Sequence, residues 1–214
     1  DLAAFLYTSG TTGRSKGAML TQGNLLSNSK ALASEWEFTS KDVLIHALPI
    51  FHTHGLFVAT NISLLAGSKI FFMPKFDLDV IIDQMPNATT MMGVPTFYTR
   101  LLEDARFTKE LAQDMRLFVS GSAPLLAETH VQFEERTGHR ILERYGMTET
   151  NMNTSNPYNG ERRAGTVGFP LPGVEIKITD SNTGETLPQG EIGEIEVRGP
   201  NVFKGYWQMP EKTA

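Results

Sequence analysis

Apolar residues in the first part of the chain fall into two kinds of stretch. Short unbroken apolar runs between glycine, proline or polar residues indicate buried strands, whereas apolar residues three or four apart indicate helices with one buried face. The predicted strands are residues 2–8, 42–48, 69–73, 89–94, 117–121 and 140–146. The predicted helices are residues 21–36, 56–65, 77–85, 95–104 and 125–137. Strands that alternate with helices favour a parallel sheet covered by helices.

The pattern changes in the last quarter of the chain. Residues 174–180 and 191–199 alternate apolar and polar positions with a period of two, and a turn at 181–185 lies between them. Such alternation is typical of antiparallel strands. We therefore predict an α/β fold with a mainly parallel sheet covered by helices, followed by a small antiparallel β-rich lobe. The expected subdomains are residues 1–164 and 165–214.

Composition narrows the functions that this fold can serve. The chain has 214 residues, 40% of them apolar, with 19 Lys and Arg against 24 Asp and Glu and a formal net charge of −5. This balance argues against nucleic acid as the main partner, because binding a phosphate backbone needs a basic surface. A nucleotide needs only a local pocket. The absence of cysteine excludes a disulfide scaffold, a thiolate nucleophile and a cysteine metal site.

The ends of the sequence suggest a piece of a longer protein. The opening residues, DLAAFLYTSG, hold no Met and no basic stretch, unlike a signal peptide, and resemble the middle of a strand. The closing residues, GYWQMPEKTA, complete no element. No apolar run approaches the ~18–20 residues of a membrane helix, so no membrane span is predicted. The expected location is the cytoplasm, or an organelle matrix in a eukaryote.

A loop rich in glycine and hydroxyl groups follows the first strand. Residues 7–19, YTSGTTGRSKGAM, contain three glycines and Lys16. Glycines let backbone N–H groups approach an anion, hydroxyls add donors and lysine adds positive charge, so the loop suits a triphosphate. It is not a Walker A loop, because Gly17 rather than Ser or Thr follows the lysine. The alternative is a flexible polar surface loop.

This loop is the first of six ordered motifs. They are residues 7–20 (YTSGTTGRSKGAML), 47–56 (ALPIFHTHGL), 120–125 (SGSAPL), 145–150 (YGMTET), 165–173 (GTVGFPLPG) and 193–207 (GEIEVRGPNVFKGYW). Together they resemble the acyl-adenylate-forming superfamily, which includes acyl-CoA synthetases, luciferases and peptide-synthetase adenylation domains. One departure is Ser15, where the family usually has proline. The resemblance implies ATP, Mg²⁺ and coenzyme A as cofactor and co-substrates, and a nucleotide- and acyl-binding role for residues 1–164.

The resemblance also implies the ATP-binding residues. Tyr145 would stack on adenine, Thr148 would donate to the α-phosphate, and Glu149 would hold Mg²⁺, which prefers carboxylate oxygen. Without the motif, Tyr145 is interpreted as a core aromatic residue and Glu149 as an acid at a helix start. The other implied ATP-binding residues are Thr8, Ser9, Gly10, Thr11, Thr12, Gly13, Lys16, Gly121, Ser122, Ala123 and Gly146.

An acyl pocket beside the α-phosphate is implied as well. His52 would close it, and Ser120 and Met152 would border it. With Thr148 and Glu149, His52 completes the implied catalytic residues. His54 is interpreted as a buried histidine with its hydrogen bonds satisfied. The His-Thr-His triplet is not a convincing metal site, because no acidic or cysteine ligand lies nearby.

Arg100 bears on which acid enters that pocket, because it lies in GVPTFYTR, on a pocket-lining segment of the superfamily. A dicarboxylate would need a cation, since its second carboxylate cannot be buried unpaired, and arginine matches a carboxylate with two hydrogen bonds. The chain looks most like malonyl-CoA synthetases, which implies an ATP-dependent ligase acting on malonate or methylmalonate. The alternatives are a synthetase for a fatty or aryl monocarboxylate and a non-catalytic nucleotide-binding fragment. The alternative for Arg100 is a helix-surface residue that pairs with Glu103 or Asp104. Arg162 and Arg163 are either a second cationic feature or part of a solvated loop.

Some parts of the family pattern lie outside this chain. The Tyr-x-x-Gly-Asp segment, the hinge and the small C-terminal domain with the catalytic lysine would follow residue 214. That domain rotates between the two half-reactions in the superfamily. We therefore expect the chain by itself to turn over slowly or not at all.

Overall fold

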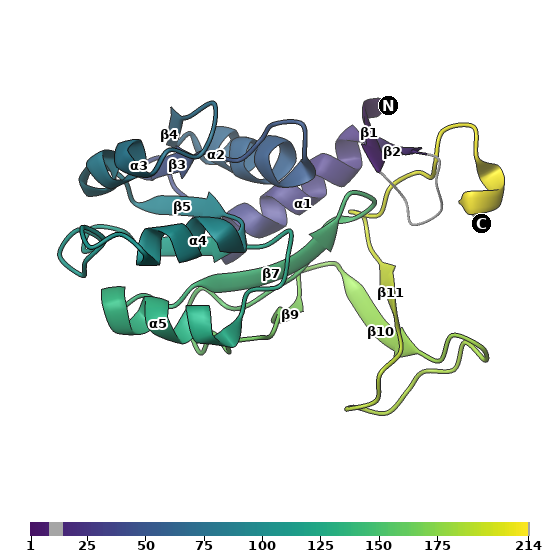
Figure 1. Ribbon diagram of the computed structural model, residues 1–214. Coiled ribbons are helices and arrows are strands. Elements are labelled where there is room, and N and C mark those ends of the chain that lie inside the picture. The colour runs from purple at the N-terminus through teal and green to yellow at the C-terminus, as the bar shows by residue number, and fades with distance from the viewer. Residues whose placement is uncertain (9–14, 214) are drawn as a thin grey trace.

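The computed structural model describes residues 1–8 and 15–213. Its centre is a seven-stranded sheet in the order β4-β3-β5-β6-β7-β8-β9 (Figure 1). The first five strands in this order run parallel, and β8 and β9 add antiparallel pairs at one side. The strands are β3 (Val43–His46), β4 (Lys69–Phe72), β5 (Thr90–Gly93), β6 (Leu117–Ser120), β7 (Leu142–Met147), β8 (Asn151–Ser155) and β9 (Phe169–Pro170). The predicted α/β fold is confirmed.

Helices cover both faces of this sheet. The helical segments are α1 (Gln22–Glu35), the π-helix η1 (His54–Thr60), α2 (Asn61–Ala66), α3 (Leu78–Gln84), the 3₁₀ turn η2 (Met85–Asn87), α4 (Pro95–Leu102), α5 (Ala127–Thr137) and the 3₁₀ turn η3 (Pro210–Lys212). Capping side chains fix two of the starts, since Thr21 accepts from the N–H of Asn24 and Asp77 from that of Val80. The segment predicted as one helix at 56–65 is a π-helix, η1, that continues directly into α2.

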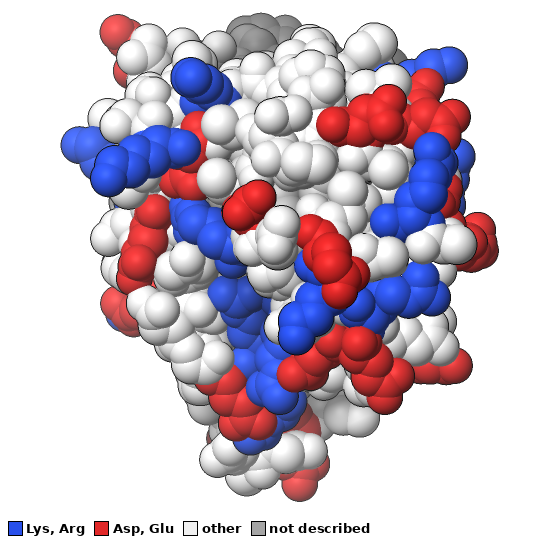
Figure 2. Space-filling model, turned by 90° about the vertical axis from the view of Figure 1, so that its left-hand side faces the viewer, with Lys and Arg blue, Asp and Glu red and all other residues white. Residues whose placement is uncertain are grey.

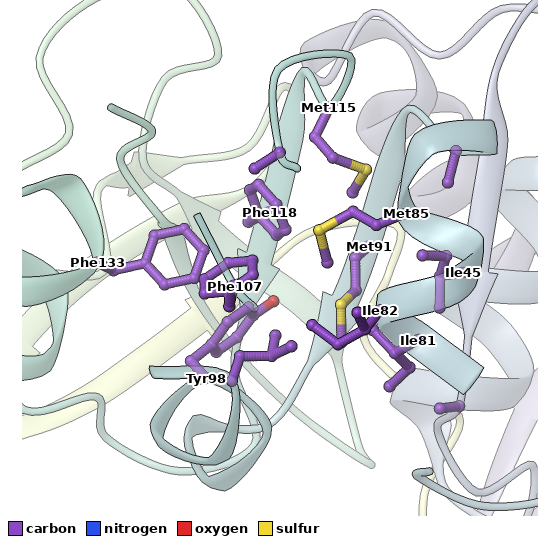
Figure 3. Close-up of a cluster of buried hydrophobic side chains, with 14 of the residues drawn as sticks. Ile45, Ile81, Ile82, Met85, Met91, Tyr98, Phe107, Met115, Phe118 and Phe133 are labelled. Atoms are coloured by element: carbon purple, nitrogen blue, oxygen red, sulfur yellow. The ribbon is translucent and has the colours of Figure 1, made fainter. Parts of the chain in front are cut away.

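Two apolar clusters show how the layers pack. Ile45, Met91 and Phe118 of the sheet pack with residues of α3, α4 and α5, including Tyr98 and Phe133 (Figure 3). Neighbouring sheet residues point to the opposite face, because side chains of a strand alternate. There Leu44, Met92, Leu117, Val119 and Leu142 meet α1, η1 and α2. The result is a sheet between two helical layers.

The first predicted strand lies elsewhere, which corrects its predicted place in the buried parallel sheet. β1 (Leu2–Thr8) pairs antiparallel with β2 (Lys16–Thr21) in a separate two-stranded sheet, and its residues are exposed or half-buried. A short connection can join antiparallel strands, whereas parallel strands need a long crossover. Only the few residues between Thr8 and Lys16 connect these strands, so the chain returns as a hairpin.

The predicted antiparallel strands in the last quarter are confirmed. β10 (Glu175–Thr179) pairs with β11 (Glu194–Arg198), and Figure 1 shows the pair extending away from the helical layers. Strands β8 and β9 were not predicted. β8 reads NMNTS, a mostly polar sequence, yet all five of its residues are buried. Amide groups explain this, because Asn28 donates to the carbonyl of Met152 at 2.7 Å and accepts from its N–H at 3.1 Å.

Surface charges are mixed on the face seen in Figure 2, where basic and acidic side chains lie interspersed. Arg106 bridges Asp79 at 2.6 Å and Asp104 at 2.7 Å, and Arg140 pairs with Glu134 at 2.7 Å. Among the helices that the structure describes, none is both long and apolar enough to cross a membrane.

Candidate active site

Two adjacent cavities lie where β5, β6 and β7 end, the edge of a parallel sheet at which ligands of α/β proteins usually bind. The smaller, about 340 Å³, is called the Tyr145 cavity after one of its lining residues. The larger, about 690 Å³, is called the Glu149 cavity. Ser122, Arg144 and Gly146 line both. The cavities therefore form one site with two compartments.

The Tyr145 cavity gathers the residues predicted to bind adenine. Its lining includes Ser122, Ala123, Tyr145 and Gly146. Ser120, which was predicted to border the acyl pocket, lines this cavity instead of the Glu149 cavity. Tyr145 is only half-buried, so its interpretation as a core aromatic residue does not fit. The loop at residues 120–125 has an unusual backbone, since Ser122 has a φ of 70°, a conformation that non-glycine residues rarely adopt. Such strain is typical of ligand-binding loops.

Gly121 has a different role from the one predicted along the base edge. A Cβ on Gly121 would lie 2.3 Å from Cζ of Arg144 and 2.5 Å from its Nε. Only glycine therefore leaves room for the guanidinium of Arg144 beneath the loop. Gly121 is buried and is not part of the lining of either cavity.

The Glu149 cavity gathers the residues predicted for phosphate, metal and acid. The predicted residues in its lining are Thr8, His52, Ser122, Gly146, Thr148, Glu149 and Met152. The rest of the wall combines the apolar residues Leu48, Val94 and Phe97 with polar ones, namely Thr53, His54 and Arg144. The cavity thus combines a polar end suited to phosphate with an apolar wall suited to an acyl group.

Glu149 lies in the tight turn between β7 and β8, not at a helix start as the alternative interpretation supposed. It is 9% exposed, and its Oε1 accepts a hydrogen bond from the hydroxyl of Tyr206 at 2.6 Å. Lys16 Nζ lies 4.4 Å from the centroid of the Tyr206 ring. Burial and the hydrogen bond to Glu149 raise the pKa of Tyr206. Sequence reasoning gave Tyr206 no role, although it lies in the last of the six motifs.

Part of the predicted phosphate loop cannot be placed. Ser9, Gly10, Thr11, Thr12 and Gly13 lie outside the described residues. The two predicted residues that flank them are described. Thr8 lines the Glu149 cavity, and the buried Oγ1 of Thr8 has no hydrogen-bond partner in the part of the chain that the structure describes. Lys16 lies beside Tyr206, as above.

The two histidines of the HTH triplet occupy different environments. His52 is exposed at the cavity wall, whereas His54 is buried. Nδ1 of His54 lies 3.2 Å from Oγ of Ser122, but Nε2 is buried without a partner among residues 1–8 and 15–213. Burial lowers the pKa of His54 well below its usual value, and the positive charge of Arg144 lowers it further, so the ring is neutral. The predicted burial is confirmed, and the hydrogen bond expected at Nε2 is not found within the described residues.

The π-helix η1 begins at His54, two residues after His52, and short π segments often occur at functional sites. Gly55 is required there because a Cβ would lie 2.3 Å from the carbonyl oxygen of Pro49. The carbonyl of Gly55 also accepts from Oγ1 of Thr60 at 2.9 Å and lies 2.9 Å from Nε2 of His46. These contacts hold the segment against β3.

Arg100 lies on α4, one helical turn after Phe97, but it is exposed and is not part of the cavity lining. Its Cζ lies 4.4 Å from the centroid of Phe76, whose ring packs on Phe97 at 4.4 Å. Phe97 itself lines the cavity. Within the described residues Arg100 forms no ion pair, so the alternative pairing with Glu103 or Asp104 is not observed.

Arg144 was not predicted and is the most unusual side chain of the site. It is 4% exposed, and neither Nε nor Nη2 has a hydrogen-bond partner in the described parts of the chain. Burial lowers its pKa to about 10, so it remains charged at neutral pH. The sequence did hold a sign of this buried arginine, since ILERYG places a basic residue on a predicted buried strand, two positions before Gly146.

Arg162 is a structural residue. Its guanidinium donates to the carbonyls of Arg140 at 2.7 Å, Tyr158 at 2.8 Å and Pro157 at 3.1 Å. It therefore holds the chain after β8 in place rather than supplying a second cationic feature. For the described residues, no cluster of three or more His, Cys, Asp or Glu is present.

A two-compartment site at the carboxyl edge of a parallel sheet, with Thr148 and Glu149 in its larger compartment, is typical of the ligand-binding domain of an α/β protein. The AMP-binding enzyme family matches residues 1–207, and the chain belongs to this family.

Its relatives include ligases for several acids. The chain is 44% identical to a malonate–CoA ligase of Arabidopsis thaliana over 233 residues, covering 100% of this chain and 38% of the relative. It is 37% identical to a long-chain-fatty-acid–CoA ligase of Bacillus subtilis, covering 100% and 39%. The crystal structure of ATP-bound MatB from Rhodopseudomonas palustris matches with 67% identity and a TM-score of 0.98, covering 100% of this chain and 42% of that one. The chain thus spans about two-fifths of the length of these proteins.

Proposed function

We propose that this chain is the nucleotide- and acid-binding part of an ATP-dependent acid–CoA ligase that acts on malonate or methylmalonate. One observation carries the proposal: the Glu149 cavity joins a polar end, with Thr148 and Glu149, to an apolar wall beside the Tyr145 cavity. Such a site can hold a nucleotide and a small acid side by side. The 44% identity to a malonate–CoA ligase supports the choice of acid.

The proposed reaction has two steps. A carboxylate oxygen of the acid attacks the α-phosphorus of ATP, and the bond to pyrophosphate breaks, which leaves an acyl-adenylate. The thiol of coenzyme A then attacks the acyl carbon, AMP leaves, and the thiol proton passes to solvent. Because the first step brings an anion to a polyanion, the protein must align the reactants and neutralise charge.

The proposed roles follow the two compartments. Tyr145 stacks on adenine, and Ser122, Ala123 and Gly146 border the base. Thr148 donates to the α-phosphate, while His52 and Met152 border the acid. Lys16 and the loop from Thr8 to Gly13 hold the outer phosphates.

Glu149 suits a magnesium ion. Mg²⁺ is usually held by one or two carboxylates together with substrate phosphates and water, rather than by a cluster of acidic side chains. A single buried carboxylate in the cavity wall matches that requirement. When bound, the ion would neutralise phosphate charge. Tyr206 would keep Glu149 oriented through its hydrogen bond.

A monocarboxylate ligase is the second candidate. The apolar residues Leu48, Val94 and Phe97 in the wall favour it, as does the similarity to a fatty-acid ligase. Arg100 is the cation that the sequence predicts for a dicarboxylate, but it lies behind Phe76 and Phe97. The choice between the two acids therefore depends on which charged group reaches the cavity.

Exchange of labelled pyrophosphate into ATP tests the proposal. It should be measured on the protein at its natural full length, with malonate, methylmalonate, butyrate or no acid added. We expect exchange that depends on malonate or methylmalonate. Exchange with butyrate alone would support the monocarboxylate ligase, and ATP binding without exchange for any acid would identify a non-catalytic nucleotide-binding protein.

A further inference from the structure

Tyr206 contacts two charged residues of opposite sign at the edge of the candidate site. Its hydroxyl donates to Oε1 of Glu149 at 2.6 Å, and Nζ of Lys16 lies 4.4 Å from the centroid of its ring. Lys16 belongs to the predicted phosphate loop, and Glu149 is the predicted magnesium ligand. One side chain therefore links the two charged groups on which the proposed phosphate site depends.

The backbone on either side of Tyr206 joins the same two parts of the chain. The N–H of Trp207 donates to the carbonyl of Gly17 on β2 at 2.8 Å, and the N–H of Phe203 donates to the carbonyl of Glu149 at 2.8 Å. Figure 1 shows this closing part of the chain passing beside β1 and β2. Tyr206 is thus fixed by its own backbone between the phosphate hairpin and the turn that carries Glu149.

We propose that Tyr206 is a positioning residue that keeps Lys16 and Glu149 from pairing with each other, so that Lys16 meets phosphate and Glu149 meets Mg²⁺. This inference rests on the proposed ligase function. Opposite charges at a half-buried site attract each other strongly, and the flexible stem of lysine lets its ammonium move towards a carboxylate. Within residues 1–8 and 15–213, however, neither Lys16 nor Glu149 forms an ion pair.

Tyrosine suits this position because it contacts both charges without adding a third. The face of its ring attracts an ammonium, while its hydroxyl donates to a carboxylate. Burial and the hydrogen bond to Glu149 raise the pKa of Tyr206, so the hydroxyl keeps its proton and remains a donor at neutral pH. The hydrogen bond is made through Oε1 of Glu149, so Oε2 can still bind a metal ion.

Lys16 adjoins the Glu149 cavity. It is the cross-strand partner of Thr8 in the hairpin of β1 and β2, and Thr8 lines this cavity together with Glu149. Directly opposite residues of an antiparallel pair place their side chains on the same face. Without the ring of Tyr206, Lys16 would therefore move onto Glu149 at the place proposed for phosphate and metal.

The test separates the ring of Tyr206 from its hydroxyl by ATP binding, measured by calorimetry on the protein at its natural full length. Tyr206→Phe removes the hydroxyl and keeps the ring, whereas Tyr206→Leu removes both. Each variant is titrated with ATP in EDTA and again across a range of magnesium concentrations, with and without Lys16→Met. Trp207→Leu is the matched control, because Trp207 contacts Phe5 at 5.4 Å on the opposite face of the hairpin.

In EDTA we expect Tyr206→Phe to bind ATP within about 1.5-fold of the wild type and Tyr206→Leu to bind it about 3–5-fold more weakly, because only the second loses the cation–π contact. With magnesium, Tyr206→Phe should raise the concentration for half-maximal binding by about 3–10-fold, through the lost hydrogen bond. Tyr206→Leu should raise it by about a further 3-fold, since Lys16 then competes with the metal for Glu149.

Two controls assign these effects. In the Lys16→Met background, Tyr206→Phe and Tyr206→Leu should bind ATP equally well in both conditions, because no ammonium remains to be held. Trp207→Leu should match the wild type within about 1.5-fold, since its side chain faces away from the site. If Tyr206→Leu does not fold, Tyr206→Met takes its place, because methionine fills irregular gaps.

Several results would overturn the inference. Equal ATP affinities of Tyr206→Phe and Tyr206→Leu in EDTA would do so, and tighter binding by Tyr206→Leu would mean that the ring holds Lys16 away from phosphate. A difference that persists with Lys16→Met, or that Trp207→Leu reproduces, would reflect a general loosening of the fold. A wild type that does not bind ATP would refute the ligase function as well. The expected binding effects without pyrophosphate exchange for any acid would refute the ligase function alone.

Discussion

Gly121→Ala is expected to destabilise the fold through a single neighbour, the guanidinium of Arg144. The added Cβ would lie 2.3, 2.5 and 2.7 Å from Cζ, Nε and Nη1, all well inside van der Waals contact. Since Arg144 is 4% exposed, its guanidinium can yield only toward the two cavities that it lines. Overpacking of this kind costs about 1–3 kcal/mol of unfolding free energy.

A double-mutant cycle isolates that contact. Arg144→Ala removes the atoms that the new methyl group would meet, so Gly121→Ala should cost little in its presence. The coupling free energy should then be about −1 to −3 kcal/mol, the size of the relieved clash. Urea unfolding followed by fluorescence provides the assay, because Trp36 is fully buried and donates to Oγ of Ser155 at 2.9 Å. Additive effects of the two substitutions, within about 0.5 kcal/mol, would refute the packing argument.

Two further predictions concern polar contacts. Asp42→Asn should cost about 1.5–3 kcal/mol of unfolding free energy in urea titrations, because Asp42 accepts from Arg116 at 2.7 and 2.8 Å and from Thr89 at 2.8 Å; a loss below about 0.5 kcal/mol would contradict this. Burial raises the pKa of Asp42, but these hydrogen bonds outweigh it and hold the pKa below its ordinary value. The wild type should therefore lose this stability as the pH falls from about 4 through the lower folded-state pKa, and Asp42→Asn should lose less over the same range. Tyr206→Phe should raise the magnesium concentration for half-maximal ATP binding, measured by calorimetry, by about 3–10-fold, because Glu149 loses the hydrogen bond that orients it; an unchanged magnesium requirement would exclude that role.

The sequence predicted the central layers well because their signals are local. Strands such as residues 89–94 and 117–121 are short apolar runs, and helices such as 77–85 carry both a periodic face and a capping residue. The hairpin of β1 and β2 escaped prediction, since an apolar run does not reveal whether its partner strand is parallel. Strand β8 escaped because its burial depends on amide hydrogen bonds from Asn28, which is 124 residues away from Met152.

The candidate site was predicted unevenly for a similar reason. Motifs placed Thr148, Glu149 and Tyr145 in the two cavities, since a short segment sets their spacing. Arg100 and Arg144 look equally plausible in the sequence, and only packing separates them. One lies on the outer face of a helix, and the other lies beneath a glycine from a different loop. Contacts between distant segments thus decide which of the two arginines is buried beside the cavities.

One hairpin concentrates most of the chemistry of this molecule. From Arg144 on β7 through the turn at Glu149 to Met152 on β8, seven of nine consecutive residues line one or both of the cavities. The remaining strands and helices form the scaffold that holds this hairpin in place. Substitutions at a few neighbouring codons would therefore change the lining of both cavities and leave the sheet as it is. A protein family whose site is concentrated on one hairpin should diversify its substrates quickly, while its sheet and helices change slowly.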